Sequence, residues 1–148
     1  MTRFNTGHIG LNVTDIQQSK AFYQDVFGFD VIGESTDTEK KFVFLAEDGQ
    51  LVLTLWQQSN GRFPTDNPGL HHLAFAVEDV AQIEAVERKL QAIGAKIYHN
   101  GIVTHREGAA SGGLFFEDPD GIRLEVSTAK GVEGHPAPSG DAPTCGFF

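Results

Sequence analysis

A chain of 148 residues, 40% hydrophobic and 21% charged, has the length and composition of one globular domain with a sizeable core. The formal net charge of −9 argues against nucleic-acid or anionic-membrane partners, and no apolar run approaches the roughly 20 residues of a membrane-spanning helix. Residues 1–7 lack an apolar signal-peptide core, and a single cysteine, Cys145, excludes an internal disulfide, so we expect a cytoplasmic protein.

The first half of the chain begins with a strand pattern that gives way to a helical pattern. Apolar and polar residues alternate over 8–13, which predicts a strand with one apolar face. Asp15 is a predicted helix N-cap with Gln18 in a capping box, and Gly28 is the predicted end of that helix. Three strands and a hairpin turn complete the pattern: 29–34, 41–47 and 50–57, with Asp48-Gly49 as the turn.

The same pattern starts again after a Gly-, Pro-, Asn- and Ser-rich connector at 59–69. The stretch His72–Asp79 restates His8–Asp15 at a constant offset of 64 residues. Asp79 is a second predicted N-cap with Gln82, and Gly94 is the predicted helix end. Strands are predicted at 95–99, 113–117 and 121–127. The chain is therefore predicted to hold two β-α-β-β-β units in tandem, at 6–58 and 70–128.

The tail at 129–148 differs in composition from the rest of the chain. It is rich in glycine and proline and has no apolar periodicity, so it is predicted to be extended or disordered. Its two terminal aromatic residues, Phe147 and Phe148, are unusual for a free tail, and docking on the domain or on a second subunit is the alternative. Cys145 is interpreted as an incidental exposed cysteine, with a redox or ligand thiol as the alternative.

Three side chains of metal-binding type lie at related places in the two units. His8 and His72 open the first strands, and Glu125 stands in the last strand, where a carboxylate is unfavoured without a partner. By pleat parity all three project away from the apolar, helix-facing rows. Two imidazoles and a carboxylate suit Fe(II), and less selectively Mn(II), Ni(II) or Zn(II). Any one of them alone would more often be structural; together they predict a metal site, with His71 pointing the opposite way as a structural or supporting residue.

The chain resembles the vicinal oxygen chelate superfamily, which includes glyoxalase I, extradiol dioxygenases, and fosfomycin- and bleomycin-resistance proteins. The resemblance is carried by 8–13, 21–29, 72–77 and 116–125 and covers about 4–128, so residues 1–128 are predicted to be this family's domain. It implies an α+β fold whose sheets curl around a cleft holding one divalent metal, with ligands at the positions of His8, His72 and Glu125. It also implies a homodimer.

The chain departs from each branch of that family. Glyoxalase-like enzymes use a fourth ligand, a Glu, where this chain has Leu53 if the hairpins are matched or Thr54 if residues are counted from His72. Dioxygenases usually carry a Tyr at the position of Phe115 and a catalytic His at that of Arg106, which has His105 beside it. Fosfomycin enzymes use a Lys- and Ser-rich loop that the stretch 105–111 does not match.

The loop 99–113 is the predicted variable element. It is either a lid with His105 as acid or base and Arg106 as an anion clamp, or a solvated connector. Predicted substrate-binding residues are Thr54, Trp56, Arg106 and Phe115, although core packing explains Trp56 and Phe115 equally well. The favoured function is a metal-dependent enzyme acting on a small oxygen-chelating substrate, with an Fe(II) extradiol-type dioxygenase slightly ahead of a glyoxalase-like lyase or isomerase. A metal-free drug-binding protein is the non-enzymatic alternative.

Overall fold

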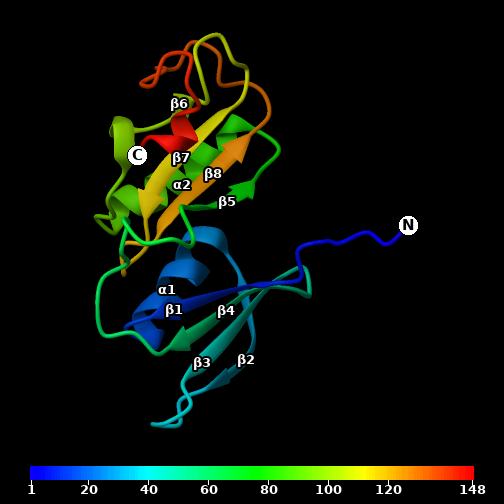
Figure 1. Cartoon of the computed structure of the whole chain (residues 1–148), viewed down its shortest axis with the longest axis vertical. Helices are drawn as coiled ribbons and strands as arrows, with labels where there is room; N and C mark the ends of the chain where they lie inside the picture. Colours follow the sequence, from blue (N-terminus) through cyan, green and yellow to red (C-terminus); the bar gives the residue numbers. More distant parts are fainter. The chain divides into compact units, whose positions relative to one another are not determined.

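The computed structural model describes residues 1–148 as two compact units, Met1–Arg62 and Phe63–Phe148. Each unit holds a four-stranded sheet and one long helix (Figure 1). The predicted α+β class and the two β-α-β-β-β units are therefore confirmed. Neither helix has the length and apolarity needed to cross a bilayer.

The first unit has the sheet order β1-β4-β3-β2, in which the first and last strands of the unit pair in parallel. Asp15 caps its helix by accepting hydrogen bonds from the Gln17 and Gln18 amides, and Gly28 ends it in the left-handed conformation at φ 74°. The helix lies on β3 and β4, so it covers one face of the sheet and leaves the other face free of the helix. The elements are β1 (Ile9–Val13), α1 (Ile16–Phe27), β2 (Asp30–Ser35), β3 (Phe42–Glu47) and β4 (Gln50–Gln57).

The second unit repeats this plan with the order β5-β8-β7-β6. The predicted capping box of Asp79 and Gln82 is present at the start of its helix. After the helix, Gly94 takes a positive φ of 69°. The helix packs on β7 and β8. The elements are β5 (Leu73–Ala76), α2 (Val80–Ala92), β6 (Val103–Thr104), β7 (Gly112–Glu117) and β8 (Arg123–Thr128).

The predicted strand at 95–99 is wrong. Ile97 forms only an isolated bridge with Phe116, and a short 3-10 helix, η1 (Tyr98–Asn100), follows. His99 and Asn100 have φ values of 58° and 60°, a left-handed backbone that cannot continue a strand. The edge of the sheet is instead the two-residue strand β6, which is too short to give a periodic signal.

The tail is ordered on the second unit, so the prediction of an extended or disordered segment is wrong and the docking alternative holds. Its backbone carbonyls at Pro136 and Gly140 accept from the amides of Thr104 and Glu107, and Thr144 is fully buried. The end of the tail, in red in Figure 1, includes the 3-10 helix η2 (Thr144–Gly146). Sequence periodicity misses this packing because the tail pairs its polar backbone groups with other segments and its one regular element, η2, is only three residues long.

Gly112 lies against both β6 and the tail and provides a test of the packing around it. A Cβ at this position would lie 2.6 Å from Val132 Cγ1 and would also collide with the Val103 carbonyl oxygen. Overpacking of this kind costs about 1–3 kcal/mol, so Gly112→Ala should lower the free energy of unfolding in urea by that amount. Gly61→Ala, where the new methyl group meets nothing within 4 Å, is the control and should change it by less than about 0.5 kcal/mol. Equal effects of the two substitutions would contradict the close packing.

Candidate functional site

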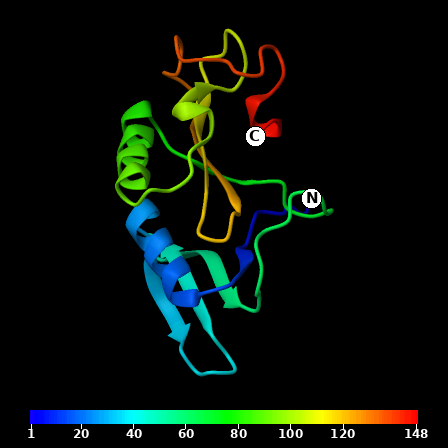
Figure 2. The ribbon, with the colours of Figure 1, turned by 90° about the vertical axis from the view of Figure 1, so that its left-hand side faces the viewer.

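The last strand of the second unit presents two charged side chains on the sheet face that α2 does not cover. Leu124 and Val126 are buried in the row that faces the helix, so alternation along β8 places Arg123 and Glu125 on the opposite face. Figure 2 shows α2 (green) on one side of this sheet and the end of the tail (red) on the other. Because the tail covers that face, Glu125 is only 3% exposed and Arg123 only 9%.

The buried Glu125 carboxylate is held between two histidines. His105 Nε2 lies 2.6 Å from Oε1, and His72 Nε2 lies 3.4 Å from Oε2. An ionised carboxylate only accepts hydrogen bonds, so in the tautomer with its proton on Nε2 His105 is the donor of this contact. His105 Nδ1 lies 3.0 Å from Ser111 Oγ, which fixes the ring from its other side. The loop that carries His105 therefore reaches the predicted ligand Glu125.

His71 turns its ring toward His72, with 2.8 Å between the two Nδ1 atoms. Pleat parity had placed it on the opposite face, but β5 begins only at Leu73, so residue 71 is free of that constraint. Burial is the first cause that lowers the pKa of His71, and the charge of Arg123 and the neighbouring His72 act in the same direction. A neutral His71 can orient the His72 ring, as a supporting residue of the site does.

Aromatic rings cover the two histidines and the carboxylate. Phe115 is the cross-strand partner of Glu125 and is fully buried. Its ring centroid lies 4.6 Å from that of Phe148, which in turn lies 5.5 Å from the His72 ring and 5.1 Å from the Tyr98 ring. Arg123 Nη1 donates to the backbone oxygen of Phe148 at 2.6 Å.

Sequence reasoning singled out Phe115 and the odd terminal aromatics, but it missed three residues of this site, Arg123, Tyr98 and Ser111. Parity along β8 was a usable signal for Arg123. His71 was placed only as a structural or supporting residue. No pattern in the sequence pointed to Tyr98 or Ser111, which lie in irregular segments.

The first unit settles which residue occupies the place of the fourth ligand. Gly10 pairs with Thr54 in the first sheet, and Ala74 pairs with Glu125 in the second. Gly10 and Ala74 correspond in the repeat, so Thr54 corresponds to Glu125, and the count from His72 is the right one. The Thr54 hydroxyl already accepts a hydrogen bond from Trp56 Nε1 at 3.0 Å. The chain thus offers three candidate ligands, His8, His72 and Glu125, and has a threonine in place of the fourth.

Three aromatic rings share that face of the first sheet with Thr54. The Phe42 centroid lies 4.9 Å from Phe44 and 5.6 Å from Trp56. All three side chains are half-buried, so Trp56 belongs to a cluster that is packed on one side and accessible on the other. Trp56 is therefore neither fully buried in the core nor fully exposed, and its role as a cleft residue stays a prediction.

Two donor atoms of the second unit are spaced as two ligands of one divalent ion would be. Two ligand atoms, each about 2.1 Å from one ion at a tetrahedral angle, are about 3.4 Å apart, and this is the distance between His72 Nε2 and Glu125 Oε2. His105 is too close to Oε1 for this role and acts as a hydrogen-bond partner. His8 is exposed at the start of β1 in the first unit. As the side chains stand, no group of three or more His, Cys, Asp or Glu residues is arranged to hold an ion.

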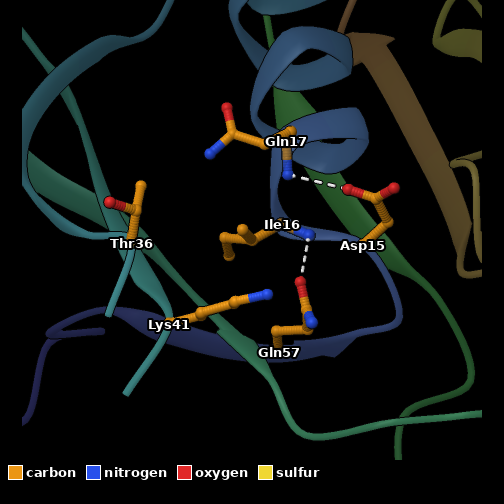
Figure 3. A pocket seen from close by; sticks show the side chains of 6 residues that line it. All are labelled: Asp15, Ile16, Gln17, Thr36, Lys41 and Gln57. Atoms are coloured by element: carbon orange, nitrogen blue, oxygen red, sulfur yellow. Dashed lines mark hydrogen bonds between the residues drawn. The ribbon is translucent and has the colours of Figure 1, made fainter. Parts of the chain in front are cut away.

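The remaining predicted residue, Arg106, is exposed and no side-chain contact defines a role for it. A separate cavity of about 340 Å³ lies at the start of α1 (Figure 3). None of the predicted site residues lines it, and its helix donors are already used, because Ile16 N bonds Gln57 Oε1 and Gln17 N bonds Asp15 Oδ1. Its lining residues are Asp15, Ile16, Gln17, Thr36, Lys41 and Gln57.

Comparison with known proteins places these features in a family context. Residues 5–126 match the model of the Glyoxalase/Bleomycin resistance protein/Dioxygenase superfamily. The chain is 36% identical to the uncharacterized protein YaeR of Escherichia coli over 80% of its length and 92% of that protein. It is 32% identical to a lactoylglutathione lyase of Salmonella typhimurium over 83% and 91% of the two chains. It is 30% identical to a catechol-2,3-dioxygenase of Bacillus subtilis, over 62% of this chain and 33% of that enzyme.

Solved structures give the same fold. A glyoxylase/bleomycin resistance protein/dioxygenase domain from Frankia superposes with a TM-score of 0.74 at 24% identity, over 90% of this chain and 96% of that one. The fosfomycin resistance protein FosX of Listeria monocytogenes, in a complex with Mn(II) and sulfate, superposes with a TM-score of 0.64 at 18% identity, over 86% and 93%.

Cys145 offers a chemical probe of the Glu125 carboxylate. Burial raises the pKa of the Cys145 thiol, and the negative charge of Glu125 raises it further. Because only the thiolate is alkylated, iodoacetamide should modify native Cys145 more slowly at pH 8 than a free thiol. Glu125→Gln removes the charge, lowers the pKa and should accelerate the reaction, whereas Glu133→Gln at an exposed position should not. An unchanged rate in Glu125→Gln would show that the two groups do not interact.

Proposed function

The chain belongs to the Glyoxalase/Bleomycin resistance protein/Dioxygenase superfamily, and from this premise we propose that it is a mononuclear metal-dependent enzyme acting on a small oxygen-chelating substrate. An Fe(II) extradiol-type dioxygenase is the favoured reaction class. The observation that carries the proposal is the Glu125 carboxylate, 3% exposed and held between His72 and His105. Burying a carboxylate between imidazoles is costly without a cation to balance it, and a divalent metal provides that charge.

His8, His72 and Glu125 would hold the metal. Fe(II) is favoured for two imidazoles and one carboxylate, and Mn(II), Ni(II) and Zn(II) suit the same donors less selectively. The Mn(II) complex of the structurally similar FosX supports a divalent ion. When bound, the metal supplies a Lewis acid with open positions for vicinal oxygens of a substrate.

The chain's own residues supply the proton chemistry and the substrate contacts. His105 Nε2 carries a proton aimed at the ligand oxygen Glu125 Oε1 and can pass it to a substrate oxygen held there, with Ser111 keeping the ring in place. We assign substrate contacts to Thr54 and Trp56, an anion contact to Arg106, and the apolar wall behind Glu125 to Phe115. We further propose a cytoplasmic homodimer, the assembly that the family resemblance implies.

A glyoxalase-like lyase or isomerase is the second candidate. The similarity to the lactoylglutathione lyase extends over 91% of that enzyme, whereas the similarity to the catechol-2,3-dioxygenase covers only 33% of it. The residue Thr54 counts against this candidate, because a hydroxyl bonded to Trp56 Nε1 stands where these enzymes have a Glu as the fourth metal ligand. A metal-free drug-binding protein would not need a buried carboxylate between two histidines, so this arrangement counts against the third alternative.

Metal analysis of variants tests the ligand set. Protein purified anaerobically should carry one equivalent of divalent metal. His8→Asn, His72→Asn and Glu125→Gln should each weaken the metal affinity by more than the roughly 10- to 100-fold that loss of a supporting residue costs. His135→Asn, a histidine of the tail outside this set, is the matched control. A wild type that binds no divalent ion, or a His8→Asn variant that binds as the wild type does, would refute the set.

Turnover assays separate the reaction classes. Oxygen uptake with a catechol panel in the Fe(II)-loaded protein supports the dioxygenase, and hemithioacetal turnover with Ni(II) or Zn(II) supports the lyase. At saturating metal, His105→Asn should lower kcat by about 10²- to 10⁴-fold, the usual contribution of an acid or base, while the metal content stays at one equivalent. Arg106→Gln should mainly raise KM. A His105→Asn enzyme with full kcat would remove His105 from the mechanism.

A further inference from the structure

We propose that the face of the second sheet opposite α2 binds an aromatic compound bearing an acidic group, and that Phe148 occupies this site while no such compound is bound. We call it the Phe148 site; its lining residues are His71, His72, Tyr98, Phe115 and Arg123. This compound class would be the substrate class of the site described above, and to that extent it rests on the proposed function. Its binding can be tested without metal.

The ring of Phe148 has the surroundings of a bound aromatic ligand. Its centroid lies 4.6 Å from the Phe115 ring, and the rings of Tyr98, His72 and His71 present their edges at 5.1, 5.5 and 6.1 Å. Edge-to-face and tilted contacts at these distances are the favoured geometry between aromatic rings. Its neighbour Phe147 is 62% exposed, so only one of the two terminal aromatic rings lies in these surroundings.

Arg123 supplies the second half of the recognition. Its guanidinium group is part of a side chain only 9% exposed and donates from Nε to the His71 carbonyl and from Nη1 to the backbone oxygen of Phe148. A guanidinium group forms its strongest hydrogen bonds with anionic oxygens, so the place now held by the oxygen of Phe148 suits an acidic group.

The covalent skeleton of Phe148 indicates the spacing between ring and acidic group in the ligand. Its ring is separated by two carbon atoms, Cβ and Cα, from the carbon whose oxygen meets Arg123. The same skeleton in a small molecule is 3-phenylpropanoate, whose carboxylate can take the place of the Phe148 oxygen at Arg123. Such a ligand would lie beside His72 and Glu125, next to the proposed metal. Release of the tail end is then coupled to binding, because ring and ligand compete for one place.

Isothermal titration of the full chain in EDTA with 3-phenylpropanoate tests the proposal. If the closed form dominates, with about 10% or less of the molecules open, removal of the competing ring strengthens the apparent affinity by about tenfold or more. Phe148→Ala should show this gain. Phe147→Ala, the matched control one position away, should bind as the wild type does. A Phe148→Ala protein that binds no more tightly than the wild type would overturn the proposal.

Ligand analogues test the role of Arg123 without a substitution that endangers folding. On Phe148→Ala, 3-phenylpropan-1-ol keeps the ring without the charge, and butanoate keeps the charge without the ring. Both should bind at least about tenfold more weakly than 3-phenylpropanoate, the alcohol because it loses a charge-assisted hydrogen bond and butanoate because it loses the aromatic contacts. Equal binding of acid and alcohol would refute recognition by Arg123. Failure here with metal binding intact refutes only this inference, and loss of metal binding with acid binding intact refutes only the proposed function.

Discussion

A buried carboxylate that needs positively polarised partners on both oxygens is the constraint around which the second unit is built. Glu125 stands on a strand whose other charged residue, Arg123, is also buried. His72 comes from the segment before β5, and His105 comes from the loop after β6. The tail then fixes that loop through the Thr144 amide, which donates to the His105 carbonyl at 2.7 Å. Segments distant in sequence are thus held in place by one acidic group.

The two units share a plan but have diverged on the face where their chemistry lies. At the position where the second unit places Glu125, the first places Thr54, and its hydroxyl is occupied by an indole N–H. The first unit offers exposed His8 and an aromatic cluster, while the second offers a closed, charged centre. A duplicated scaffold can keep its core and change one residue on the opposite face, because alternation along a strand separates the two.

Much of the scaffold could be predicted from the sequence because its signals are local. Asp15, Gly28 and Asp79 are caps with specific chemistry, and the restated His72–Asp79 stretch revealed the second unit. The candidate ligands His72 and Glu125 followed from parity and do lie together. The rest depended on contacts without a periodic signature. The left-handed backbone at His99 broke an expected strand, and the tail acquired order only through carbonyl and amide groups that pair with a distant loop.

The parallel pairing within each unit has a consequence for how the chain acquires its structure. The first strand of each unit pairs with the last, Ile9 with Leu53 and Leu73 with Leu124, so it has no partner until nearly the whole unit has left the ribosome. Closing such distant segments costs chain entropy before any contact offsets it. During synthesis β1 and β5 therefore remain open edges, able to pair wrongly with another nascent chain. Gly10 and Ala74 lie between the larger apolar residues of these strands. Their small side chains make each unpaired strand less hydrophobic than a strand of large apolar residues would be.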